Sequence, residues 1–308
     1  MGQQTDLEQS VMRTILWFSL FSYPLTVFEI WKWLLKPQRP YDLIEVYSIL
    51  EKSDWLKQML ETSGGFYALK GKNINEMLKD RQVRFLDAER KYKSLRRIAK
   101  FFSLLPAVRS VGAVNTMAWW STTPTSDIDL YVVTKPGSIW SSRFWLVLPF
   151  LLTGQRPMHH KQSKQEKNSF CFSFFSTTEH LQMEHLCFPR DYYMAFWVKS
   201  LVPILDRDGS FAIFHQENRW ATRLLPNAHS RVHHWSHKTV MIPSILFQFK
   251  FLEPFFRVVQ QRRLPLPLRK LANLDSRVVV TDEILKFHEN DRRLQFRDAF
   301  ESLLERYL

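Results

Sequence analysis

Two aspartates separated by one residue, Asp127 and Asp129, have the clearest capacity for chemistry in this 308-residue chain. They open the segment "DIDLYVVT", whose other residues are typical of a buried β-strand. Alternate residues of a strand point to the same face, so the two carboxylates should converge. They would repel each other unless a cation lay between them, and hard oxygen ligands suit Mg²⁺ or Mn²⁺. A simpler interpretation is that Asp127 caps the strand and Asp129 pairs with an arginine.

The segment in front of the aspartates, "VRSVGAVNTMA", reads as a strand that runs into a polar loop. Together with "SDIDL" it resembles the minimal motif of the polymerase-β-type nucleotidyltransferase fold, in which a Gly-Ser pair ends one strand and Ser-Asp-Ile-Asp-Leu opens the next. The opening "FSLFSYPLTVFEIWKWL" resembles bacterial nucleotidyltransferase-domain proteins that carry a "YPLT" winged helix before this core. Stretches such as "NRWATRLLPN" and "SRVVVTDEILKFHENDRR" extend the resemblance over most of the chain.

The resemblance implies where a triphosphate would bind. Counting back from Asp127 by the family's spacing places the Gly-Ser pair at Asn115 and Thr116. Asn is among the few non-glycine residues that tolerate a left-handed backbone, and Thr keeps the hydroxyl that would bond a phosphate oxygen. An alternative register uses Gly112 and Ala113, which lie further from the aspartates.

The remaining roles that the resemblance implies concern the metal and the phosphates. Asp127 and Asp129 would hold Mg²⁺ (or Mn²⁺), with an NTP as substrate. Ser126 joins the expected nucleotide-binding residues. Lys135 and Arg143 follow the aspartate strand and could meet phosphates, although each could equally be an ordinary surface charge.

A third carboxylate is the missing part of the motif. Active members of the wider fold usually place one on the next strand, but "NSFCFSFFST" has none, and its equivalent position is Ser173. Glu166 precedes this strand and Glu179 follows it. Further along, His288 and Asp291 could serve an acceptor or cap a helix. Because two-metal catalysis needs ligands on both ions, a weak or one-metal enzyme and a nucleotide-binding relic both remain open.

The N-terminal segment shows three helix starts followed by a hairpin signal. Thr5-x-x-Glu8 and Thr26-x-x-Glu29 are capping boxes, Asp42 is a further N-cap, and two extended runs flank Gly64-Gly65. Three helices and a hairpin predict a winged helix-turn-helix over residues 1–72. Its third helix, "DLIEVYSILEKS", is acidic, whereas helices that read DNA grooves need basic and amide side chains. We therefore expect a packing or dimerisation module, with only weak, non-specific nucleic-acid binding.

The rest of the chain divides into three expected parts. Residues 73–108 predict a basic connecting helix, 109–205 an α/β nucleotidyltransferase core, and 206–308 a helical region, with helices dominating from residue 190 onwards. The fold class is thus α+β. The net charge of +13 arises after residue 72, and "RPMHHKQSKQEK" (156–167) adds a basic cluster. Cys171 and Cys187 form no disulfide framework, which fits a reducing cytoplasm. The apolar run 144–152 is too short to span a membrane.

These observations predict a cytoplasmic, Mg-dependent nucleotidyltransferase that moves a nucleoside monophosphate from an NTP to an acceptor hydroxyl. The acceptor is left open among a small molecule, a nucleic-acid end and a protein hydroxyl. The alternative is a catalytically degenerate nucleotide-binding protein or a winged-helix regulator.

Overall fold

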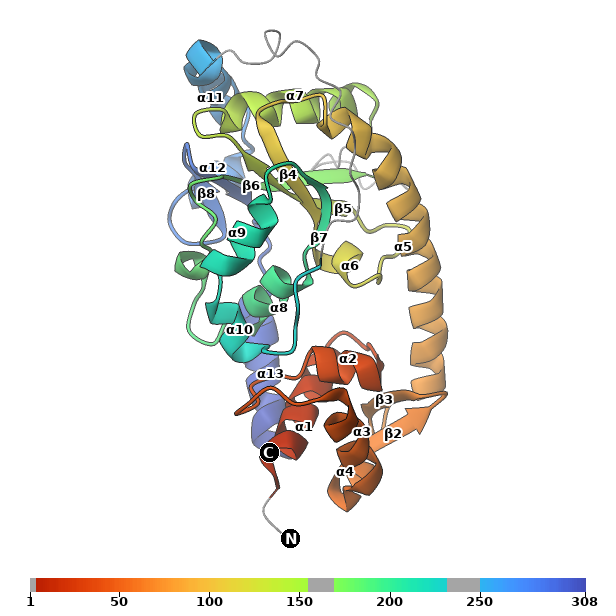
Figure 1. The fold of residues 1–308 in the computed structure, drawn as a ribbon. Coiled ribbons are helices and arrows are strands. Elements are labelled where there is room, and N and C mark those ends of the chain that lie inside the picture. The colour runs from red at the N-terminus through yellow and green to blue at the C-terminus, as the bar shows by residue number, and fades with distance from the viewer. Residues whose placement is uncertain (1–3, 155–168, 232–249) are drawn as a thin grey trace.

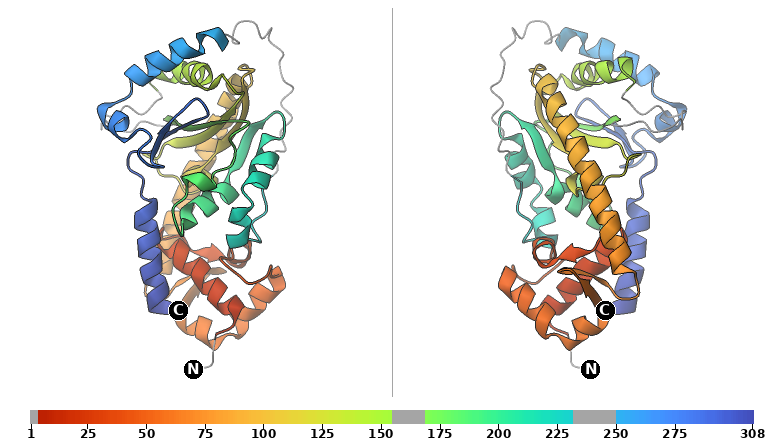
Figure 2. Two further views of the ribbon diagram at one scale, coloured as in Figure 1. Left: turned by 90° about the vertical axis from the view of Figure 1, so that its left-hand side faces the viewer. Right: turned by 90° about the vertical axis from the view of Figure 1, so that its right-hand side faces the viewer.

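The computed structural model describes residues 4–154, 169–231 and 250–308. It is a mixed α and β structure with a six-stranded mixed sheet, a separate three-stranded sheet near the N-terminus, and helices packed against both (Figure 1). The long helix α5 runs from the small sheet along the large one, and the C-terminal helix returns towards the N-terminal helices (Figures 1 and 2).

The N-terminal module, residues 4–72, packs four helices around the small antiparallel sheet. Both predicted capping boxes are present, at Thr5 with Glu8 and at Thr26 with Glu29, and the hairpin turns at Gly64-Gly65, where both residues have positive φ. The sheet has the order β1-β3-β2. The elements are α1 (Asp6–Ser19), β1 (Leu25–Thr26), α2 (Val27–Lys32), α3 (Leu43–Lys52), α4 (Asp54–Met59), β2 (Leu60–Ser63) and β3 (Phe66–Leu69).

The large sheet has the strand order β7-β4-β5-β6-β9-β8. Only β5 and β6 run parallel, joined by a helical crossover, and every other neighbouring pair is antiparallel. The strands are β4 (Val108–Ala113), β5 (Ile128–Thr134), β6 (Phe170–Thr177), β7 (Val202–Asp206), β8 (Val278–Val280) and β9 (Ile284–Phe287).

Helices cover both faces of the large sheet, because its central strands carry apolar residues on both sides. One face packs against α5 (Ile74–Phe102), α7 (Ile139–Leu152), α11 (Glu253–Arg262) and α12 (Leu266–Leu271). The other packs against α8 (Tyr192–Ser200), α9 (Ser210–Glu217), α10 (Trp220–Leu224) and α13 (Arg293–Tyr307). Short elements complete the chain: α6 (Asn115–Ala118), η1 (Glu184–Leu186) and η3 (Lys250–Leu252). No helix among the described residues is long and apolar enough to cross a bilayer.

The expectation of a helical chain beyond residue 190 is wrong in three places, where β7, β8 and β9 form. β7 pairs with β4, and β9 pairs with β6. These strands from the C-terminal part of the chain therefore form hydrogen bonds with the backbone groups on the outer sides of the central strands. Their residues, "VPILD", "VVV" and "ILKF", are short apolar runs that favour a strand once an edge is available. Tertiary pairing therefore decides their structure.

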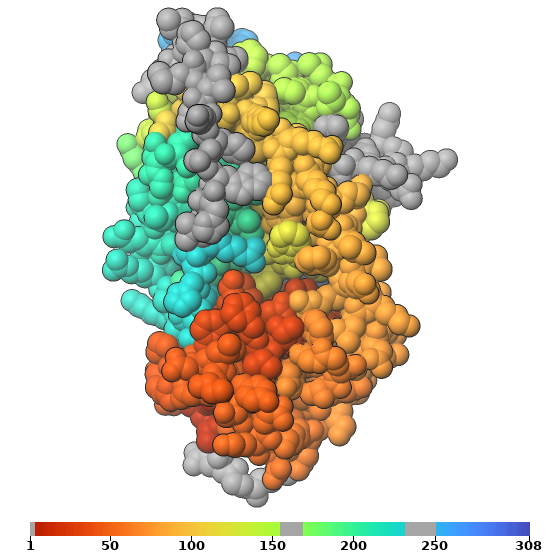
Figure 3. Space-filling view, turned by 45° about the vertical axis from the view of Figure 1, so that its right-hand side comes forward, coloured from red at the N-terminus to blue at the C-terminus, as the bar shows by residue number. Residues whose placement is uncertain are grey.

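The N-terminal module is packed firmly onto the core through aromatic side chains. Trp17 stacks on Phe196 of α8 with ring centroids 5.1 Å apart. Trp119, in the loop after α6, receives the edge of Phe18 at 5.2 Å and lies 4.6 Å from the ring of Trp33. The space-filling view shows the module and α5 in continuous contact with the rest of the molecule (Figure 3). The module thus forms one hydrophobic core with α8 and α10.

Candidate functional site

Polar side chains gather at one end of the strands of the large sheet, because four strands begin or end there. β4 ends next to Asn115, and β5, antiparallel to it, begins between Asp127 and Asp129. β6 runs parallel to β5 and places Cys171 beside Asp129. β9 runs antiparallel to β6 and ends just before His288. The topology therefore brings residues from four separate segments to one place.

Asp129 sits in an unfavourable environment for a charge. The pKa of its carboxyl is raised to about 6, mainly by burial and also by the charge of Asp127, and a hydrogen bond from Asn115 opposes the rise. That bond runs from Nδ2 of Asn115 to Oδ2 of Asp129 at 3.0 Å. An amide, rather than an arginine, is thus the partner of Asp129. A divalent cation would reduce the electrostatic repulsion between the two neighbouring carboxylates.

Asp127 lies just outside β5 and accepts a hydrogen bond from the hydroxyl of Ser169. It shares a hollow of about 570 Å³ with Cys171 and Ser173. Burial and the charge of Asp129 raise the pKa of the Cys171 thiol, so the sulfur stays protonated. Within the described ranges, no lysine, arginine or histidine forms an ion pair with either aspartate.

Asn115 adopts a left-handed backbone, with φ of +53°. Its carboxamide is fixed on both sides, because Tyr193 Oη donates to Oδ1 at 3.1 Å while Nδ2 holds Asp129. Gly112 is instead a regular residue of β4, opposite Tyr131. A Cβ added there would lie 2.9 Å from Cδ2 of Leu201, so this glycine permits close packing. The left-handed position is therefore Asn115.

Thr116 and Ser126 differ in how free their hydroxyls are. Thr116 is exposed, and its hydroxyl has no hydrogen-bond partner among the described residues. Ser126 Oγ accepts from the backbone N–H of Thr123 at 3.0 Å and also contacts the Thr123 hydroxyl. Thr116 is therefore available to a ligand, whereas Ser126 shapes the loop before β5.

Lys91 of α5 is a positioning residue that the sequence did not reveal. Its side chain is fully buried, and its Nζ donates to the carbonyls of Thr123 at 2.5 Å and Ser126 at 2.6 Å. Asp87, one turn earlier, lies 3.0 Å from Nζ and accepts from the hydroxyl of Thr122 at 2.7 Å. The two side chains tie the loop in front of the aspartates to α5. The sequence shows that Asp87 and Lys91 are four residues apart. Basic residues on a helix usually lie on its solvent-exposed face, however, so this spacing does not predict a buried lysine.

The two predicted phosphate cations occupy different places. Arg143 is buried on α7, donates to Oε1 of Gln260 at 2.5 Å and lies over the ring of Phe287 at 4.7 Å. It lines the same hollow as Asp127. Lys135 follows the far end of β5, roughly 20 Å along the strand from Asp129 at about 3.3 Å per residue. The structure therefore does not bring Lys135 to the carboxylates.

The strand beside β5 offers neutral groups where a third carboxylate was sought. Ser173 Oγ lies 3.5 Å from Nε2 of His288, and burial lowers the pKa of that imidazole to about 3. Glu179 follows the opposite end of β6. Glu166 and the basic cluster 156–167 lie outside the described residues. Within the described chain, no group of three or more Asp, Glu, His or Cys side chains could hold a metal ion.

The donor set fits one hard cation better than two. Mg²⁺ is commonly held by one or two protein carboxylates, with waters and substrate phosphates completing its octahedron. Asp127 and Asp129 supply such a pair, and their like charges at a partly buried edge favour a cation between them. A second ion would need ligands that β6, with Cys171 and Ser173, does not provide.

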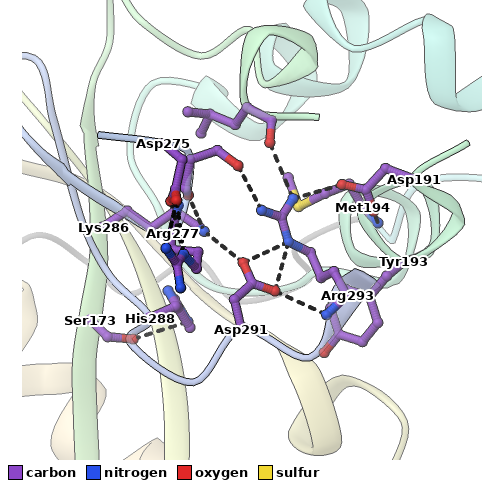
Figure 4. A network of polar contacts seen from close by, with 12 residues as sticks. Ser173, Asp191, Tyr193, Met194, Asp275, Arg277, Lys286, His288, Asp291 and Arg293 are labelled. Atoms are coloured by element: carbon purple, nitrogen blue, oxygen red, sulfur yellow. Dashed lines mark hydrogen bonds and ion pairs between the residues drawn. The ribbon is translucent and has the colours of Figure 1, made fainter. Parts of the chain in front are cut away.

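A second polar cluster lies nearby and is fully paired (Figure 4). Arg293 contacts Asp191 at 2.7 Å and Asp291 at 2.8 Å, and Lys286 lies 3.3 Å from Asp291. Burial lowers the pKa of Lys286 to about 8. Asp291 also accepts from the backbone N–H of Arg293 at 3.0 Å, so it caps the start of α13. We call these four residues the ion-pair network.

Comparison with known proteins gives no family. The protein-family models, the curated proteins and the solved structures that were searched contain no match to this chain. Its function must be argued from the site itself.

Proposed function

We propose that the chain binds an NTP with one Mg²⁺ at the sheet edge and transfers its nucleoside monophosphate to an acceptor hydroxyl. The observation that carries this proposal is the carboxylate pair Asp127 and Asp129, which forms no ion pair with a described cation and stands beside a left-handed residue, Asn115. A structural pair of aspartates would be compensated by local cations, as the ion-pair network is.

The chain's own residues would have distinct tasks. Asp127 and Asp129 would hold the cation, which would supply charge neutralisation for the phosphates and for the leaving pyrophosphate. The Thr116 hydroxyl and the backbone at Asn115 contact the β- and γ-phosphates. Lys91 keeps the loop before Asp127 in place, since it binds two of the loop's carbonyls. Positioning and charge neutralisation supply most of the rate, because phosphoryl transfer needs little covalent help from the protein.

A second candidate is nucleotide binding without transfer. Cys171 and Ser173 occupy the strand where a third carboxylate was expected, and this favours a site that binds better than it catalyses. Product formation with a labelled NTP separates the two: pyrophosphate release or a labelled acceptor supports transfer, and binding without release supports the second candidate.

We propose that the N-terminal module belongs to the winged-helix class, because its helices α1 to α4 are followed by the hairpin of β2 and β3. Its third helix carries acidic residues, exposes Ile44 and Tyr47, and has one cation, Lys52. We propose that the module builds the core rather than reads DNA.

The test is a thermal-shift titration with each NTP in the presence of Mg²⁺. A ligand that binds only the folded state raises the melting temperature. Asp129→Asn should abolish the Mg-dependent shift, whereas the exposed control Asp298→Asn should keep it. Thr116→Val removes one hydrogen bond to a charged group and should weaken binding roughly 10- to 150-fold, while Thr62→Val on the exposed hairpin should not. An undiminished shift in Asp129→Asn contradicts the proposal.

A further inference from the structure

A partly open pocket of about 290 Å³ lies where the N-terminal module meets the core. Its walls come from separate parts of the chain: Trp17 and Phe18 of α1, Trp119 after α6, and Trp197 of α8. Thr116 lines the same pocket, so it opens beside the proposed phosphate contact. Flat aromatic walls that face a small volume favour a planar ring, through offset or edge-on ring contacts.

The charge of this pocket is positive. Arg84 of α5 lines it, is partly buried, and makes no hydrogen bond or ion pair with any described residue. Arg231 lies close to Tyr23, another lining residue, and to Tyr92. Within the described residues Arg231 likewise lacks an ion-pair partner. Uncompensated arginines beside an apolar cavity are costly unless an anion binds them.

Glu29, which accepts a hydrogen bond from the hydroxyl of the lining residue Tyr23, does not offset these cations. Glu29 is held by both terminal nitrogens of Arg81, at 2.6 Å and 3.0 Å. The Arg81 guanidinium also lies over the ring of Tyr23 at 4.2 Å. Glu29 and Arg81 therefore neutralise each other and leave Arg84 and Arg231 to an outside anion.

We propose that this pocket binds a planar aromatic anion, a one- or two-ring molecule bearing a carboxylate or phosphate that Arg84 meets. The site goes beyond the proposed nucleotidyl transfer, because it is built without either aspartate. It also explains why the N-terminal module is fused to the core: α1 supplies one wall. Tyr193 lines the pocket and donates to Asn115, so an occupant would reach the carboxylate pair through one hydrogen-bonded chain.

Two charged-and-neutral probe pairs test the proposal by calorimetry in EDTA, where no divalent cation can contribute. One pair is 2-naphthoate and 2-naphthamide, and the other is AMP and adenosine. The charged member of at least one pair should bind at least tenfold more tightly than its neutral partner. Binding of AMP alone identifies a nucleotide as the occupant, and binding of 2-naphthoate identifies a separate aromatic acid.

Two arginines of the same helix provide the matched variants. Arg84→Gln should remove the preference for the charged probe, and Arg97→Gln, exposed on α5, should keep it. Asp129→Asn should also keep it, so failure of the proposed transfer activity leaves this result standing. The proposal is overturned if neither charged probe binds, if charged and neutral probes bind equally, or if Arg97→Gln weakens binding as much as Arg84→Gln.

Discussion

Two clusters of buried charged residues lie at the same end of the strands of the large sheet. They differ in whether their charges are of opposite or of like sign. The ion-pair network contains two acids and two bases, and each carboxylate has a cation within 3.3 Å (Figure 4). The carboxylate pair contains two acids whose described hydrogen-bond partners are amide, hydroxyl and thiol groups, and Lys91 acts on Asp129 only as the smallest of the charge effects. Asn115, which holds Asp129, lines one pocket together with Tyr193 and with Lys286, Asp291 and Arg293 of the network.

The difference supports the proposal that the carboxylate pair binds a ligand, whereas the ion-pair network is structural. Buried charges that compensate each other hold segments in place: here they join the start of α8 to β9 and α13, which come about 90 residues later in the chain. Buried like charges destabilise the fold by themselves, and this is why we propose that the carboxylate pair is compensated by a cation from outside the chain. Removing a charge should therefore have opposite effects on stability in the two clusters.

The largest effect is expected in the ion-pair network. Arg293→Met removes the cation that serves both Asp191 and Asp291 and leaves two buried carboxylates with Lys286 alone. Breaking a buried pair in this way costs about 3–5 kcal/mol. Urea unfolding at pH 7 should show this loss. Arg297→Met, whose partner Asp298 is exposed, should change stability by less than about 1 kcal/mol, and an equal loss in both variants would falsify the assignment.

The N-terminal elements could be predicted from the sequence because their signals are local. Two capping boxes and a Gly-Gly hairpin fix where helices and strands begin, and the structure confirms them. β7, β8 and β9 could not be predicted, since they are short apolar runs whose pairing partners lie far away in the chain. The ion-pair network was missed for the same reason: Asp191 and Arg293 are separated by most of the C-terminal region.

The candidate site could be predicted where the type or spacing of a residue determines its backbone conformation or the direction of its side chain. Asn115 tolerates positive φ, and the alternation of Asp127 and Asp129 places both near one end of β5. Lys135 illustrates the limit, because a residue only a few positions later lies at the far end of the strand. Lys91 illustrates another, since burial of a lysine depends on the loop that covers it.

An intermediate effect, of opposite sign, is expected at the carboxylate pair. The folded pKa of Asp129 is about 6, above the unfolded value of 3.8, so the folded state binds a proton more tightly. Its contribution to stability is present at low pH and is lost as pH rises from about 4 to 6. A shift of this size corresponds to at most about 3 kcal/mol. In EDTA, Asp129→Asn should therefore be more stable than wild type at pH 7 and no more stable at pH 4.

The measurement is the difference in unfolding free energy between the two proteins across pH 4–7. Asp298→Asn, which removes an exposed carboxylate, serves as the control and should show no such crossover. If Asp129→Asn is less stable than wild type at pH 7, Asp129 is a structural residue like those of the network, and the contrast between the clusters fails.

The smallest effect concerns Asn115, which connects the carboxylate pair to Tyr193. Asn115→Gly removes two hydrogen bonds but relaxes a left-handed backbone that glycine adopts freely, so the net change in stability should be within about 1 kcal/mol. Asn115→Ala loses the same hydrogen bonds and keeps the backbone strain, so it should be less stable than the glycine variant by about 1 kcal/mol. Affinity for Mg-NTP should be unchanged or improved in Asn115→Gly, because the substitution clears space beside the phosphates. Unfolding curves and nucleotide titrations on both variants decide the point: equal stability of the alanine and glycine variants would show that the left-handed conformation is not required, and a large loss of nucleotide affinity in Asn115→Gly would make the carboxamide itself a ligand group.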